Sequence, residues 1–68
     1  MNIDFWKHDK WQISLCNGYL PRIGQDVAIF LEDRRDCTVY GKVVRIETIY
    51  TKISDGGRSR IVHRVFLD

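Results

Sequence analysis

The last third of the sequence, Val43–Leu67, predicts one long β-hairpin, and this feature constrains the fold more than any other. Its turn signal is Ser54-Asp55-Gly56-Gly57, because Asp-Gly pairs adopt the positive φ angles of two-residue hairpin turns. With Asp55-Gly56 at the tip, counting outwards along both strands gives a register with apolar pairs on one face and an opposite-charge pair on the other. The first face pairs Val44 with Leu67, Ile46 with Val65, Thr48 with His63 and Tyr50 with Ile61; the second pairs Arg45 with Phe66, Glu47 with Arg64 and Ile49 with Val62.

Two shorter runs near the N-terminus, Ile3–Trp6 and Trp11–Leu15, predict a second hairpin. In the second run every other residue is apolar, which places Trp11 on the same face as Ile13. The four polar residues between the runs would form the turn. A competing interpretation is one helical turn that begins at Asp4 as its N-cap. The spacing of two after Trp11 favours the hairpin.

The middle of the chain predicts two more strands with short connections. The only proline marks a loop, and Gly24 is expected to supply the turn into the next strand. That strand, Asp26–Leu31, has apolar residues on both faces, which is typical of a central strand or a barrel corner. A very long strand follows over Thr38–Ile53. Its apolar residues change face along the way, so we expect a bend or bulge at Gly41 and another near Glu47-Thr48.

Five strands with short connections predict a single all-β domain over residues 1–68, a small five-stranded SH3-like barrel or barrel-like antiparallel sheet with a long bent C-terminal hairpin. The segments Pro21–Ile29 and Tyr40–Ile46 resemble the opening of KOW-type and related SH3-like barrels. In those barrels a glycine precedes the first barrel strand and a later Gly-x-Val precedes a longer one. The resemblance covers residues 21–46. It implies a fold class in which nucleic-acid binding, ribosome or polymerase association and protein docking are all common.

The composition favours a globular protein and no membrane association. The hydrophobic share is 44%, and no apolar run approaches the roughly 20 residues that a membrane-spanning helix needs. The start of the chain lacks the basic segment and apolar core of a secretory signal. We therefore expect a complete small cytoplasmic gene product.

The residue types suited to metal binding or catalysis are scattered along the chain. The soft ligands do not stand at the spacings of zinc motifs, although their number would suffice for one site: His8, Cys16, Cys37 and His63. No nucleophile stands beside an evident base, and a chain this short has no room for a large pocket. We expect no metal, no cofactor, no catalytic residues and no enzymatic activity, with the thiols reduced.

Basic side chains gather in the second half of the chain and suggest a nucleic-acid surface. Residues 1–33 carry three basic and five acidic side chains, whereas residues 34–68 carry eight and four. Cationic side chains follow phosphate groups, and exposed aromatic rings stack on unpaired bases. Interleaved acids such as Glu47 would neutralise part of this charge. The candidate residues for RNA or single-stranded DNA are Arg34, Arg35, Lys42, Arg45, Lys52, Arg58, Arg60 and Arg64.

Aromatic residues concentrated near the N-terminus favour a different hypothesis, a non-enzymatic module that docks on or regulates a protein partner, of the kind found among small phage and accessory bacterial proteins. Trp, Tyr and Arg anchor protein interfaces, although the tryptophans could instead close the open end of the barrel. An exposed edge of the strand Thr38–Ile53 could also pair with a second copy in a homodimer. Protein docking is our main prediction and nucleic-acid binding the alternative. The candidate docking residues are Phe5, Trp6, Trp11 and Tyr40.

Overall fold

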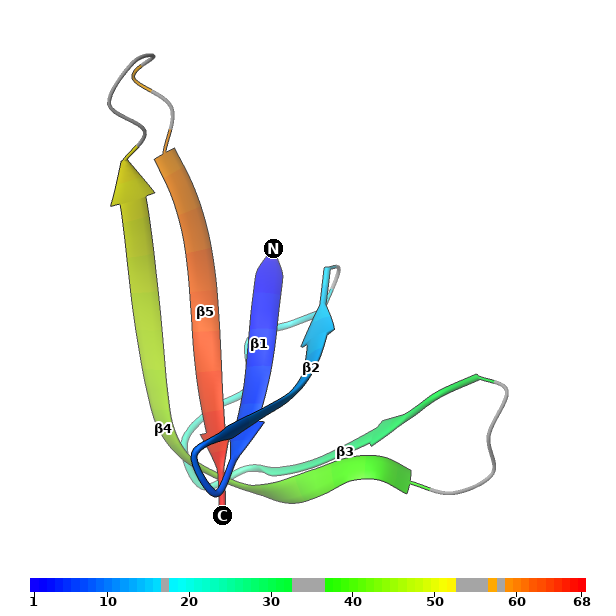
Figure 1. The fold of residues 1–68 in the computed structure, drawn as a ribbon. Helices are drawn as coiled ribbons and strands as arrows, with labels where there is room; N and C mark the ends of the chain where they lie inside the picture. Colours follow the sequence, from blue (N-terminus) through cyan, green and yellow to red (C-terminus); the bar gives the residue numbers. More distant parts are fainter. Residues whose placement is uncertain (17, 33–36, 53–56, 58) are drawn as a thin grey trace.

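Five β-strands form one curled sheet in the order β2-β1-β5-β4-β3 (Figure 1). The computed structural model describes residues 1–16, 18–32, 37–52, 57 and 59–68, and no helix occurs in these ranges. No membrane-spanning helix is therefore found in them. The prediction of a small all-β fold is confirmed, and the curled half-barrel fits an SH3-like, barrel-like architecture. The strands are β1 (Asn2–Lys7), β2 (Lys10–Leu15), β3 (Asp26–Phe30), β4 (Cys37–Lys52) and β5 (Ser59–Leu67).

The two ends of the chain meet at the centre of the sheet, where β1 pairs with β5 in parallel. The register places Asp4 opposite Arg64 and Trp6 opposite Phe66. This pairing differs from the all-antiparallel arrangement that the sequence suggested. It joins strands from opposite ends of the chain, so the alternation within either strand carries no signal for it. Its consequence is that an N-terminal tryptophan lies beside a C-terminal phenylalanine.

The register predicted for the C-terminal hairpin is confirmed along most of its length. β4 and β5 form all the predicted pairs from Arg45 to Tyr50. In one of these pairs, the Thr48 hydroxyl and the Nδ1 atom of His63 lie 2.9 Å apart and share a hydrogen bond. The predicted tip, Asp55-Gly56, lies outside the described residues. In Figure 1 this hairpin reaches well beyond the ends of β1 and β2.

β4 bends where it leaves β3 and joins β5, close to the predicted Gly41. A Cβ atom at Gly41 would stand 2.7 Å from the carbonyl oxygen of Asp68, so only glycine fits at this crossing. A bulge follows at Val44. The predicted partnership of Val44 with Leu67 is wrong, because Val43 occupies that place and Val44 is the extra residue. The second bend or bulge, predicted near Glu47-Thr48, is absent, because β4 and β5 pair in a regular register from Arg45 to Lys52.

β3 is an edge strand rather than the central strand or barrel corner that its apolar pattern predicted. It ends the strand order, next to β4. Val27 is half-buried and Ile29 is buried, whereas Ala28 and Phe30 face outward and are exposed. The predicted turn before β3 is confirmed at Gly24, whose φ angle of +89° only glycine adopts freely.

The N-terminal hairpin is confirmed, and its turn is tighter than predicted. The turn contains two residues rather than four, His8 and Asp9, whose φ angles of 52° and 62° are those of a type I′ turn. The register then shifts, because Trp6 faces Trp11 while Phe5 faces Ile13. The extra residue between those partners reverses the alternation of β2. The prediction that Trp11 shares a face with Ile13 is therefore wrong.

The core lies on one face of the curled sheet and draws residues from four strands. Strand alternation sends every second residue of β1 and of the end of β5 to this face. Five partly buried apolar residues pack around it from β2, β3, β4 and the connecting loop: Ile13, Leu15, Leu20, Val27 and Ile46. The buried residues are Ile3, Phe5, Ile29, Val39, Val43, Val65 and Leu67.

Candidate functional site

A cluster of aromatic and charged side chains lies on the face of the sheet opposite the core. The same alternation that buries Phe5 turns Trp6 to this other face, and Phe66 lies there because its neighbours Val65 and Leu67 are buried. The cluster crosses β2, β1, β5 and β4. We call it the outer patch, and it consists of Trp6, Trp11, Arg45, Glu47, Arg64 and Phe66.

Two arginines cover the two central rings of the outer patch. The ring centroids of Trp6 and Phe66 lie 6.2 Å apart at an interplanar angle of 34°. The Cζ atom of Arg45 lies 4.1 Å from the centroid of Phe66, and that of Arg64 lies 5.2 Å from the ring of Trp6. Both distances are within the range of cation–π attraction. Each guanidinium group therefore lies against a ring, although both side chains keep part of their surface in solvent.

Glu47 neutralises part of this positive charge. Its Oε2 atom lies 3.6 Å from Nη2 of Arg45, and its Oε1 atom lies 3.8 Å from Nη1 of Arg64. The three side chains remain 39–62% exposed, so these ion pairs add little to folding stability, at most about 1 kcal/mol each. Their effect is to position both guanidinium groups and to leave the trio with one net positive charge.

The two tryptophans of the outer patch differ in their hydrogen bonding. Trp11 is 55% exposed, and its Nε1–H donates to the hydroxyl of Ser14 at 3.0 Å. That hydroxyl in turn donates to Oδ1 of Asp4 at 2.5 Å. By contrast, Nε1 of Trp6 and Nε of Arg64 are buried and find no acceptor among the described groups. An unpaired buried donor costs about 1–3 kcal/mol, so this face is not optimised for folding stability.

A shallow depression of about 540 Å³ adjoins the outer patch at the end where β1 turns into β2. Two acidic side chains, Asp9 and Asp68, border it together with one cation, Arg45. It gives the patch a concave part that the side chain of a partner could enter. Its lining is Trp6, His8, Asp9, Val44, Arg45, Phe66, Leu67 and Asp68.

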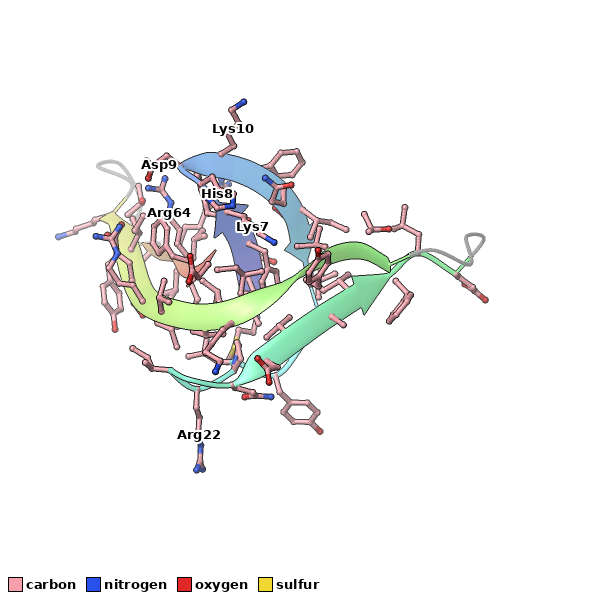
Figure 2. All side chains as sticks on the ribbon, turned by 90° about the horizontal axis from the view of Figure 1, so that it is seen from below. Lys7, His8, Asp9, Lys10, Arg22 and Arg64 are labelled. Carbon is pink, nitrogen blue, oxygen red and sulfur yellow. The ribbon has the colours of Figure 1, made fainter. Side chains whose placement is uncertain are left out.

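The predicted basic residues do not form one continuous surface in the described part of the chain. Other cations also diverge: in Figure 2, Lys10 and Arg22 point away from the sheet in different directions, while Lys7 points across toward β4. Three of the eight candidates lie outside the described residues: Arg34, Arg35 and Arg58. The other five are divided among three places, with Arg45, Arg60 and Arg64 on the outer face, Lys52 on the opposite face and Lys42 opposite Asp26.

The four predicted docking residues fall into three environments. Phe5 is 3% exposed and belongs to the core, so we leave it out of the candidate site. Trp6 and Trp11 lie in the outer patch, and neither closes an end of the barrel. Tyr40 is exposed on the arm that β3 and β4 form, where the Nζ atom of Lys7 lies 4.3 Å from its ring.

Phe66 and Glu47 are not among the site residues predicted from the sequence. The predicted hairpin already set Arg45 beside Phe66 and Glu47 beside Arg64, and the structure confirms both pairs. What the sequence did not show is that Trp6 lies next to Phe66, because that contact depends on the parallel pairing of β1 with β5.

Among the described residues, no three side chains of His, Cys, Asp or Glu come together in a way that could hold a metal ion. His63 is engaged with Thr48, and Cys16 is a free, exposed thiol. The outer patch is therefore the most developed constellation of functional side chains in the described part of the chain.

The fold and the outer patch define the class of this chain as a small all-β half-barrel with an aromatic and charged outer face. No protein-family model, curated protein or solved structure matches it. Its function must therefore be argued from its own geometry.

Proposed function

We propose that this protein is a non-enzymatic binding module that docks on a protein partner through the outer patch. One observation carries the proposal: Trp6 and Phe66 pack side by side on the face opposite the core, each with a guanidinium group against its ring. Trp and Arg are enriched among the few residues that supply most of the binding energy at protein interfaces. An aromatic centre with a charged surround is the usual anatomy of such a surface.

The charges around the patch support a protein partner over a nucleic acid. Arg45 and Arg64 already share Glu47 and already lie against aromatic rings. The adjoining depression carries the carboxylates of Asp9 and Asp68, which would repel phosphate groups. A surface that follows a phosphate backbone needs a row of free cations instead.

A quantitative capture experiment tests the proposal. The tagged chain is used as bait in an extract of the cells that express it, and captured proteins are quantified by mass spectrometry. Trp6→Ala removes the ring that packs on Phe66, so we expect at least about a tenfold loss of the specific partner. Phe30→Ala is the matched control, because Phe30 is an exposed aromatic residue on β3, outside the patch.

The folded state of both variants is checked by circular dichroism before capture. If Trp6→Ala stays folded and still captures the same proteins in the same amounts as the parent chain, the outer patch is not the docking surface. Loss of capture by Phe30→Ala alone would place the docking surface on β3 instead.

A further inference from the structure

Among the described residues, no strand neighbours one side of the second half of β4. β3 pairs with β4 between Cys37 and Lys42, and two backbone bonds follow on that side at Val43. The Val43 N–H donates to the Gln25 carbonyl at 2.9 Å, and the Gly24 N–H donates to the Val43 carbonyl at 2.8 Å. From Arg45 onward β4 pairs with β5 alone in the described structure. Figure 1 shows this stretch as the outermost strand of the tall hairpin. Its outward N–H and C=O groups are therefore available to another strand.

This edge has only one of the features with which proteins normally protect strand edges, the charged side chains of Arg45, Glu47 and Lys52. The segment from Arg45 to Lys52 contains no proline, no glycine and no bulge, and it is rich in isoleucine, threonine and tyrosine, which favour strands. The other two edge strands differ. β2 and β3 have six and five residues, and a register shift interrupts the pairing of each. The edge of β4 from Arg45 to Lys52 is thus longer and more regular than the edges at β2 and β3.

Apolar side chains next to this edge also lack cover. Tyr50 is 71% exposed and Ile61 is 45% exposed, although both lie on the same face as the buried Val65. β1 pairs with β5 from Val62 onward, so no strand among the described residues flanks this end of the hairpin on either side. A strand added along β4 would pack against Tyr50.

We propose that a second copy of this chain pairs with β4 along this edge, antiparallel, about a two-fold axis at Thr48. In that register Thr48 lies opposite Thr48 of the second copy, Ile46 opposite Tyr50, Glu47 opposite Ile49 and Arg45 opposite Thr51. Residues of the same face meet, so the two core faces lie on the same side of one continuous sheet. This inference goes beyond the docking proposal and does not depend on it.

The neighbouring registers are less favourable because they bring poorer cross-strand residue pairs together. An axis at Glu47 would set the two Glu47 carboxylates directly opposite each other, and like charges in that position destabilise a pair. An axis at Ile49 would place Lys52 opposite Ile46 and separate Tyr50 from its apolar partner. The axis at Thr48 avoids any like-charge pair and forms two aromatic–aliphatic pairs, which are among the favourable cross-strand contacts.

Sedimentation equilibrium over a wide range of protein concentrations tests this register. The parent chain is expected to show a reversible monomer–dimer equilibrium. Thr48→Lys and Thr48→Glu would each set two like charges across the axis, so each should weaken dimerisation by about tenfold or more. An equimolar mixture of the two variants should restore the dimer, because opposite charges then meet. Gln12→Lys, an exposed change on β2, is the control and should leave dimerisation unchanged.

Three outcomes would overturn the proposal. The first is a parent chain that stays monomeric at every concentration. The second is a dimer that both Thr48 variants retain at full strength. The third is a mixture of folded variants that fails to form the heterodimer. A dimer that Trp6→Ala disrupts and the Thr48 variants do not would place the interface on the outer patch, and would likewise contradict the β4 edge.

Discussion

At Gly41 the backbone of β4 passes so close to the end of β5 that a methyl group does not fit. A Cβ there would meet the carbonyl oxygen of Asp68 at 2.7 Å and Cβ of Leu67 at 3.0 Å. Both neighbours belong to the main chain or its first side-chain atom, so neither can move without shifting the strand. We expect Gly41→Ala to lower the free energy of unfolding by about 1–3 kcal/mol, measured by urea denaturation. Gly18→Ala is the control, because its nearest atom would lie at an ordinary 3.5 Å. Equal stability of the two variants would contradict the close crossing.

Core and outer-patch residues should respond differently to truncation. Ile3 is 0% exposed, so Ile3→Ala should cost about 3 kcal/mol, a large share of the stability of a domain this small. Trp6→Ala removes a half-buried ring and its contact with Phe66, which should cost about 1–2 kcal/mol. Urea denaturation of both variants measures the difference. If Trp6→Ala lowers the free energy of unfolding as much as Ile3→Ala does, Trp6 contributes to stability as a core residue.

At the scale of single elements, the β1–β2 turn is the place where the sequence fits its geometry least well. His8 and Asp9 both have positive φ angles, which Asn-Gly adopts more readily. We expect His8→Asn combined with Asp9→Gly to raise the free energy of unfolding by about 1 kcal/mol. Thermal unfolding followed by circular dichroism measures this change. A lower melting temperature would indicate that the turn is not of the type I′ form.

The β4–β5 hairpin shows which parts of an element can be predicted from local sequence. Its register from Arg45 to Tyr50 followed from a period of two and a clear turn signal, and the structure confirms it. The error at Val44 arose because two valines in succession give no sign of which one is the bulge. The error at Trp11 has the same cause, since the bulge in β2 falls at a glutamine and no glycine marks it.

At the scale of the whole molecule, strand count and strand length predicted the fold class, but contacts between distant strands were hidden. The number of short alternating runs in 68 residues was enough to indicate a small all-β, barrel-like domain. The parallel pairing of β1 with β5 was not visible, because its partners lie at opposite ends of the chain. The sequence therefore indicated Trp6, Arg45 and Arg64 as candidate residues without showing that they form one patch.

The charge distribution of the whole molecule leads to a prediction about nucleic acids. Arg45 and Arg64 already pair with Glu47, and Lys52 lies on the other face of the sheet. We therefore expect binding to RNA or single-stranded DNA to be no tighter than non-specific binding, with a dissociation constant of roughly 10⁻⁴–10⁻⁶ M at physiological salt. Fluorescence anisotropy at several salt concentrations measures it. Much tighter binding that Arg58→Glu with Arg60→Glu abolishes, without loss of stability, would favour the nucleic-acid alternative.

The most direct test of the docking claim is site-specific photo-crosslinking in the cells that express the chain. A photoreactive phenylalanine derivative replaces Trp11, an exposed residue of the outer patch, and in a parallel chain it replaces Phe30 on β3. We expect one discrete adduct with a different protein from position 11, which disappears when Trp6→Ala is added to the same chain. An adduct from position 30 with none from position 11 would contradict the assignment of the outer patch as the docking surface.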